Sequence, residues 1–133
     1  MKIAFLYAGQ GSQRVGMGRD LYDASPAFRA AFDAGHLDFD LHALCFEGAQ
    51  ETLNQTQYTQ PCMVAFACGV TAALFDAGIR PDYVAGLSLG EYSALEASGV
   101  LTAQSAIELA AYRGAAMAKA SDGIQSAMTA VLG

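Results

Sequence analysis

Two short, mainly apolar runs, each ending close to a glycine, are predicted to be buried strands. Residues 2–7 (KIAFLY) stop just before Gly9, and residues 81–87 (PDYVAGL) stop at a serine that lies between two glycines. Continuous apolar runs of this length are typical of strands covered on both faces of a sheet. A third run of the same kind, residues 126–133 (SAMTAVLG), closes the sequence.

Segments with helical patterns separate these strands. Ser25 precedes a proline and Thr102 precedes an alanine-rich run, so both are expected to cap helices. A long helix, apolar on nearly all sides, is expected to start at Thr59. Its most apolar part, residues 62–75, is too short to span a bilayer and reads as a buried core helix. The predicted helical segments are residues 26–35, 41–54 (in short pieces), 59–78, 89–99 and 103–120.

The order of strands and helices predicts an α/β fold with a parallel sheet flanked by helices. Three strands would make a thin sheet, and no segment follows the last apolar run to cover it. We therefore expect these 133 residues to be the N-terminal part of a larger domain.

Composition narrows the class of protein. Hydrophobic residues make up 53% of the chain, and 7 basic against 13 acidic residues give a net charge of −6. Without a basic cluster, nucleic acid is an unexpected partner. The N-terminal apolar run lacks a cleavage pattern, so neither a signal peptide nor a membrane span is expected. Three cysteines without zinc spacing predict buried free thiols in the cytoplasm: Cys45, Cys62 and Cys68.

The segment GLSLG, residues 86–90, lies between a predicted strand and a predicted helix, and it allows two interpretations. Ser88 and Glu91 fit a capping box, in which the serine hydroxyl accepts a helix amide hydrogen. Alternatively, Ser88 is a nucleophile on a tight strand-to-helix turn, which needs glycine at both flanking positions. The presence of both glycines favours the nucleophile.

A serine nucleophile needs a general base, which is usually a histidine. The two histidines of the chain, His36 and His42, both precede Ser88. In the α/β-hydrolase order the histidine follows the serine, and His42 reads as a helix-surface residue. The base is therefore expected outside this chain, unless Ser88 is only weakly activated.

The glycine loop at residues 8–13 (AGQGSQ) follows the first predicted strand. It is a weak dinucleotide motif, because Arg14 stands where a third glycine is required. The loop can instead offer backbone amides at the carboxyl edge of the sheet, where Gln10 would lie across from Leu89. The alternative, that these glycines only form a turn, remains open.

Arg113 lies in an otherwise apolar helical segment, next to Gly114, which allows close approach of another element. A guanidinium in such surroundings requires an anionic partner. Two kinds of partner remain possible. One is the carboxylate of a substrate, and the other is a nearby glutamate: Glu91, Glu96 or Glu108.

Four stretches together resemble the malonyl-CoA:acyl carrier protein transacylases of fatty acid synthesis and the acyltransferase domains of polyketide synthases. These are FLYAGQGSQRVGMG, LNQTQYTQPCMVAF, GLSLGEYSALEASG and AAYRGAAM, in the order and spacing of the family. The resemblance implies an α/β-hydrolase-like large subdomain. It also implies an acyl-accepting Ser88, oxyanion-hole amides from Gln10 and Leu89, malonyl-carboxylate binding by Arg113, and a place near that carboxylate for Gln60.

The implied reaction transfers a malonyl group from malonyl-CoA to the phosphopantetheine thiol of acyl carrier protein, without a metal or redox cofactor. The chain departs from the family at Leu87, where many members carry histidine. It also lacks the ferredoxin-like subdomain and the C-terminal return that supply the catalytic histidine. We therefore expect a missing C-terminal segment or a companion chain. A serine esterase and a non-catalytic module that binds carrier protein remain alternatives.

Overall fold

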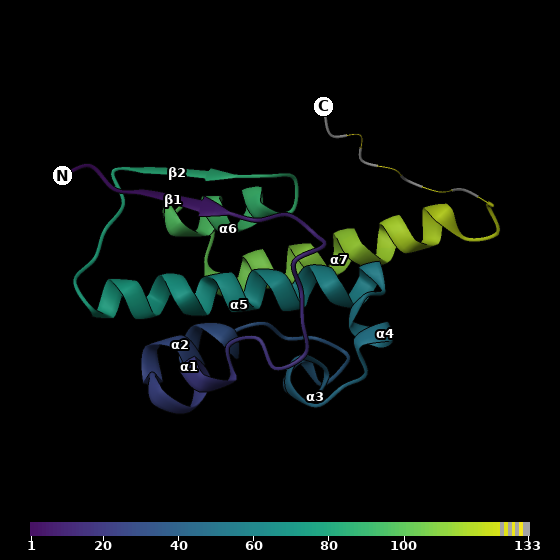
Figure 1. The fold of residues 1–133 in the computed structure, drawn as a ribbon, viewed down its shortest axis with the longest axis horizontal. Helices are drawn as coiled ribbons and strands as arrows, with labels where there is room; N and C mark the ends of the chain where they lie inside the picture. The colour runs from purple at the N-terminus through teal and green to yellow at the C-terminus, as the bar shows by residue number, and fades with distance from the viewer. Residues whose placement is uncertain (126, 128, 130, 132–133) are drawn as a thin grey trace.

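The computed structural model describes residues 1–125, 127, 129 and 131 (Figure 1). The strand predicted over residues 126–133 falls outside these described residues and stays a prediction. Within them, the strands are β1 (Ala4–Tyr7) and β2 (Tyr83–Gly86). The helices of the described part are α1 (Arg19–Ala24), α2 (Pro26–Phe32), α3 (Leu41–Phe46), α4 (Gln50–Leu53), α5 (Thr56–Asp76), α6 (Gly90–Ala97) and α7 (Ala103–Ser121).

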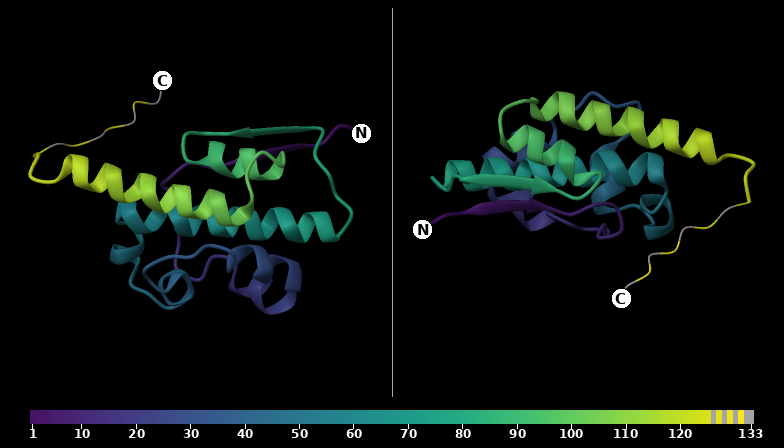
Figure 2. Two further views of the ribbon diagram at one scale, coloured as in Figure 1. Left: turned by 180° about the vertical axis from the view of Figure 1, so that it is seen from behind. Right: turned by 90° about the horizontal axis from the view of Figure 1, so that it is seen from above.

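The two strands form a parallel pair, as the sequence predicts. Ala4 pairs with Tyr83 and Tyr7 pairs with Gly86, so both carboxyl ends lie at the same edge. Helices α6 and α5 lie beneath one face of this pair (Figures 1 and 2). The side chains on the opposite face are exposed: Ala4, Leu6, Tyr83 and Ala85. In the described part of the chain, helices therefore cover one face of this parallel pair.

Helix α5 is the centre of the hydrophobic core. It lies between the sheet with α6 on one side and α2 on the other, and it packs along α7 (Figure 1). Phe28 and Phe32 of α2 are completely buried against it, as is Ile107 of α7. All three cysteines are buried and free, as predicted.

Helix α5 begins at Thr56, one turn earlier than predicted. The expected start at Thr59 assumed that Pro61 must lie in the first helical turn, but Pro61 lies inside the helix. The Gln55 carbonyl accepts the Thr59 amide hydrogen at 2.8 Å and thereby closes the additional turn. Only the helical hydrogen bond that Pro61 cannot donate is lost.

By length and composition, α5 could cross a membrane. The helix has 21 residues, and its most apolar window has a mean hydropathy of 1.3. The helix is longer than the apolar run of residues 62–75, from which no membrane span was expected. In the fold, however, 56% of that window is buried by other parts of the chain. This burial is typical of a core helix.

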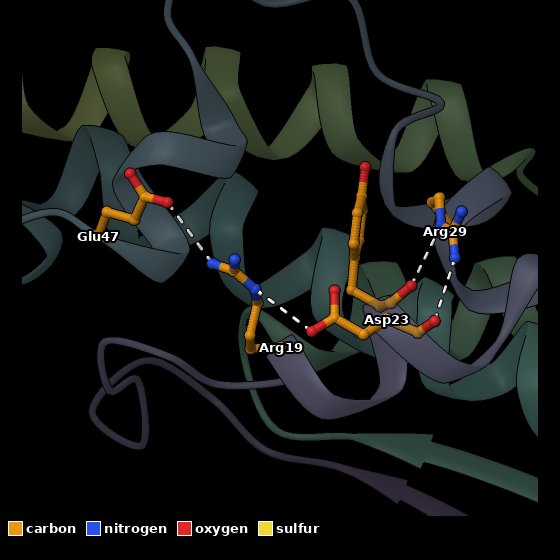
Figure 3. Close-up of polar contacts among 5 residues, drawn as sticks. Arg19, Asp23, Arg29 and Glu47 are labelled. Atoms are coloured by element: carbon orange, nitrogen blue, oxygen red, sulfur yellow. Dashed lines mark hydrogen bonds and ion pairs between the residues drawn. The ribbon is translucent and has the colours of Figure 1, made fainter.

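Polar contacts connect the short N-terminal helices (Figure 3). The Arg19 guanidinium lies 3.5 Å from the Asp23 carboxylate and 3.6 Å from that of Glu47. Arg29 donates to the backbone carbonyls of Tyr22 and Asp23 at 3.1 and 3.3 Å. Each exposed ion pair contributes about 0–1 kcal/mol, so burial of the α2 phenylalanines holds this region in place.

Local capping explains where several helices begin. Ser25 Oγ accepts the Phe28 amide hydrogen at 3.1 Å, and Thr102 Oγ1 accepts that of Ser105 at 3.1 Å, as predicted. Helix α1 was missed because it starts after Gly18, a residue without a capping side chain. Its six residues also show too few apolar positions for a helical period to be recognised.

Candidate active site

Ser88 occupies a strained turn between β2 and α6. Its φ angle is 52°, and it is the one residue other than glycine with positive φ in the described part of the chain. A Cβ at Gly86 would collide with the Gly90 backbone, and a Cβ at Gly90 would collide with the Tyr7 carbonyl. Both glycines are therefore required by contact, as a nucleophile turn predicts.

The capping interpretation of Ser88 is not supported. Helix α6 begins at Gly90 after Leu89, and no side chain caps its first turn. The Glu91 amide donates to the Ser88 backbone carbonyl at 3.1 Å rather than to the hydroxyl. The hydroxyl is exposed, at the end of a helix whose amino terminus favours negative charge.

The glycine loop after β1 contacts this turn. The Leu87 amide donates to the Tyr7 carbonyl at 3.1 Å, and a Cβ at Gly90 would lie 2.9 Å from the Ala8 carbonyl oxygen. Within the part of the chain that the structure describes, the backbone amides of Gln10 and Leu89 donate no hydrogen bond. No helix starts in the loop, which removes the remaining support for a dinucleotide site.

Arg113 of α7 reaches the serine. Its Nη2 donates to Ser88 Oγ at 3.3 Å, and its Nη1 donates to Gln60 Oε1 at 2.9 Å. The guanidinium carbon also lies 5.9 Å from the centre of the Tyr92 ring. Arg113 is therefore held by neutral groups of α5, of α6 and of the turn after β2.

Among the described residues, no carboxylate pairs with Arg113. Glu108 accepts hydrogen bonds from the Gln104 side chain and the His36 amide, at 3.0 and 3.1 Å. Glu96 lies beside Cys68, and Glu91 is exposed. The three glutamates considered as structural partners are thus placed elsewhere, and the guanidinium keeps its positive charge beside Ser88.

Gln60 connects Arg113 to the glycine loop. Its side chain is completely buried, and its Nε2 lies 3.4 Å from Gln10 Oε1. Gln10 Nε2 in turn donates to Thr56 Oγ1 at 3.2 Å. Ser88, Arg113, Gln60 and Gln10 therefore form one connected group, although the sequence placed Gln60 there only by resemblance.

The histidines belong to other parts of the fold. The His42 ring packs edge-on against Tyr22 and Phe46, with ring centres 4.9 and 4.6 Å apart, which is a structural role. His36 is exposed, and its backbone amide binds Glu108. The side-chain hydrogen-bond partner of Ser88 in the described residues is Arg113 and not a histidine.

A buried carboxyl group lies below the sheet. Burial raises the pKa of Glu96 from 4.5 to about 7, although a hydrogen bond with Cys68 lowers it. Its Oε2 is buried and has no hydrogen-bond partner in the described residues. Burial also raises the pKa of the Cys68 thiol, which makes this cysteine a poor nucleophile.

Known proteins are similar to this chain in sequence and in fold. The family described as acyl transferase domain matches residues 4–132. The malonyl CoA-acyl carrier protein transacylase of Bacillus subtilis (strain 168) is 43% identical over 134 residues, which cover 99% of this chain and 42% of that protein. The chain thus spans less than half the length of this relative.

Two solved structures agree with this result. MCAT from Streptococcus pneumoniae is 49% identical with a TM-score of 0.84, covering 90% of this chain and 39% of that one. A malonyl-transacylase in complex with its type II PKS acyl-carrier protein (PlMCAT:AntF) is 39% identical with a TM-score of 0.84, covering 90% and 40%. This chain therefore belongs to the acyl transferase domain family.

Proposed function

We propose that this chain forms the nucleophile-bearing part of an enzyme that transfers a malonyl group from malonyl-CoA to acyl carrier protein. The observation that supports this most is the pair formed by an exposed serine on a strained turn and a charged arginine that has no carboxylate partner among the described residues. The relatives named above as malonyl transacylases support the same reaction class. A neutral ester substrate would offer no anionic group to the Arg113 guanidinium, which disfavours an esterase.

The proposed reaction has two transfers. Ser88 Oγ attacks the thioester carbonyl carbon of malonyl-CoA while a base takes the hydroxyl proton. The backbone amides of Gln10 and Leu89 stabilise the oxyanion, and the intermediate collapses by breaking the carbon–sulfur bond. The base returns the proton to the departing coenzyme A thiolate. The phosphopantetheine thiol of acyl carrier protein then attacks the serine ester, and Ser88 regains its proton.

Arg113 is proposed to bind the free carboxylate of the malonyl group. A guanidinium can form two parallel hydrogen bonds with a carboxylate, and Nη2 already lies 3.3 Å from the serine oxygen that accepts the acyl group. In this role Arg113 would turn from Ser88 to the carboxylate when substrate binds. The proposed reaction needs no metal or redox cofactor, and the buried free thiols favour the cytoplasm as its location.

A further segment is proposed to complete this site. No histidine among the described residues contacts Ser88. One face of the sheet is also exposed, since Leu6 is 78% exposed and Tyr83 is 64% exposed. Parallel sheets are almost always covered on both faces. A C-terminal continuation or a companion chain that supplies the histidine would also cover this face.

The test is a transfer assay with the protein that contains this chain, malonyl-CoA and acyl carrier protein with its phosphopantetheine arm. Malonyl carrier protein should form with wild-type protein and should not form with Ser88→Ala. Hydrolysis of simple esters without transfer would instead establish an esterase. Binding of carrier protein without either reaction would establish the non-catalytic module.

A further inference from the structure

Gln60 is a completely buried polar residue whose two side-chain polar atoms both face the candidate site. Its Oε1 accepts a hydrogen bond from Arg113 Nη1 at 2.9 Å. Its Nε2 lies 3.4 Å from Gln10 Oε1 and 3.3 Å from the Met117 sulfur. The proposed chemical steps use Arg113 and the Gln10 backbone amide, but they assign no role to the Gln60 side chain.

These contacts fix the orientation of the Gln60 amide. Only its oxygen can accept from a guanidinium, so turning the amide over would bring two donors together. Because the group is buried, water cannot replace the lost hydrogen bond, and the wrong orientation is costly. The oxygen of Gln60 therefore stays directed at Arg113 and limits where the guanidinium can lie.

The neutral charge of Gln60 matters as much as its position. A glutamate in its place would also accept from Arg113, but it would form an ion pair and compete with any carboxylate ligand. An amide oxygen orients the guanidinium and leaves its full positive charge available. No carboxylate of the described residues takes this place.

We infer that Gln60 is a positioning residue that sets the preference for a malonyl over an acetyl group by holding Arg113, without itself contacting the acyl group. This inference rests on the proposed function. A positioning role differs from direct binding of the substrate. If Gln60 only positions Arg113, every effect of Gln60 on specificity must pass through Arg113.

The test compares Gln60→Met, which keeps the size of the side chain, with Gln60→Glu in the protein that contains this chain. Both should lower kcat/KM for malonyl-CoA about tenfold to a hundredfold, the equivalent of a hydrogen bond to a charged group. Transfer or hydrolysis of acetyl groups should change less than about twofold on the same argument. Gln104→Leu removes an exposed glutamine of α7 and should leave kcat/KM unchanged for both malonyl and acetyl substrates.

A double-mutant cycle separates positioning from direct contact. In an Arg113→Ala background, Gln60→Met should have no further effect on either substrate, since the residue through which it acts is gone. Additive losses in this cycle would overturn the inference. A parallel fall of malonyl and acetyl transfer in the single variants would also overturn it, because that pattern indicates general damage to the fold.

A spectroscopic measurement tests the same contact without any turnover. In protein labelled with nitrogen-15 at arginine, the bond to Gln60 should slow rotation of the Arg113 Nη groups, and Gln60→Met should restore fast rotation. Unchanged Arg113 signals in a folded Gln60→Met variant would overturn the inference. If wild-type protein transfers no malonyl group, the proposed function fails, and this spectrum still decides whether Gln60 holds Arg113.

Discussion

The Arg113 guanidinium donates a hydrogen bond to the Ser88 hydroxyl oxygen over 3.3 Å, joining helix α7 to the turn after β2. The two residues are 25 positions apart, and a buried glutamine holds the arginine from its other side. A positive charge thus lies beside the one hydroxyl that the strained turn exposes. This pairing suits an acyl group that carries its own carboxylate.

Loss of Arg113 should change substrate preference rather than simply remove activity. Arg113→Ala should lower malonyl transfer by orders of magnitude, since truncating one partner of a buried charge pair costs about 2–5 kcal/mol. Acetyl transfer should hold or rise, because a neutral acyl group leaves the guanidinium unpaired. Arg113→Lys should rescue little, as a point charge cannot form the same pair of hydrogen bonds.

The measurement is kcat/KM for malonyl-CoA and acetyl-CoA with each variant. Arg80→Ala is a matched control, because Arg80 stacks on Phe75 with a guanidinium-to-ring distance of 4.1 Å and takes no part in the site. A parallel decline of both substrates in Arg113→Ala would show that the arginine is structural.

Gly114→Ala should push α7 away from α5. A Cβ at this position would lie 2.8 Å from the Thr56 carbonyl oxygen and 3.1 Å from Gln57 Cα, both backbone atoms that cannot turn aside. Alanine normally stabilises a helix interior over glycine by about 1 kcal/mol. A lowered melting temperature would therefore report the clash directly, and an unchanged or raised one would contradict the close contact.

Glu96 should make the fold less stable as pH rises. Burial raises its pKa to about 7 from 4.5, so the folded state binds the proton more tightly than the unfolded state. The stabilisation by the protonated form is complete below about pH 4.5 and is lost as pH rises through about 7. Glu96→Gln, which stays neutral, should flatten this part of a plot of melting temperature against pH. An identical slope in the variant would exclude Glu96 as its source.

The exposed sheet face should bind hydrophobic probes. In the 133-residue chain, Leu6 is 78% exposed and Tyr83, on the neighbouring strand, is 64% exposed, and exposed apolar patches mark interaction surfaces. The chain expressed alone should increase the fluorescence of a hydrophobic dye, and Leu6→Lys should reduce that signal. Equal dye fluorescence from the chain alone and from the chain joined to the proposed C-terminal segment would argue against a covering segment.

The sequence predicted the turn at Ser88 because its cause is local. Two glycines around a serine, between an apolar run and a helical pattern, leave few alternatives, and φ of 52° at Ser88 agrees with them. The helix caps at Ser25 and Thr102 were predictable for the same reason, since cap and helix are neighbours in sequence.

The contacts between distant segments could not be predicted in this way. Three glutamates were possible structural partners for Arg113, and only the family resemblance, not the residue pattern, indicated that Gln60, 53 positions away, would lie there. The early start of α5 also escaped prediction, because Pro61 suggested a boundary that the Gln55 carbonyl overrides. Such features depend on contacts between segments that are distant in the sequence, and a local residue pattern does not indicate these contacts.

The most direct test of the account is to locate the acyl group after protein containing this chain has been mixed with malonyl-CoA in the absence of any acceptor. Digestion and mass spectrometry of the peptides should find the malonyl group on Ser88, because the turn presents this hydroxyl to the Gln10 and Leu89 amides. Ser88→Ala should remain unmodified under the same conditions. A malonyl group on another residue, or transfer-competent protein that never carries one on Ser88, would contradict the account.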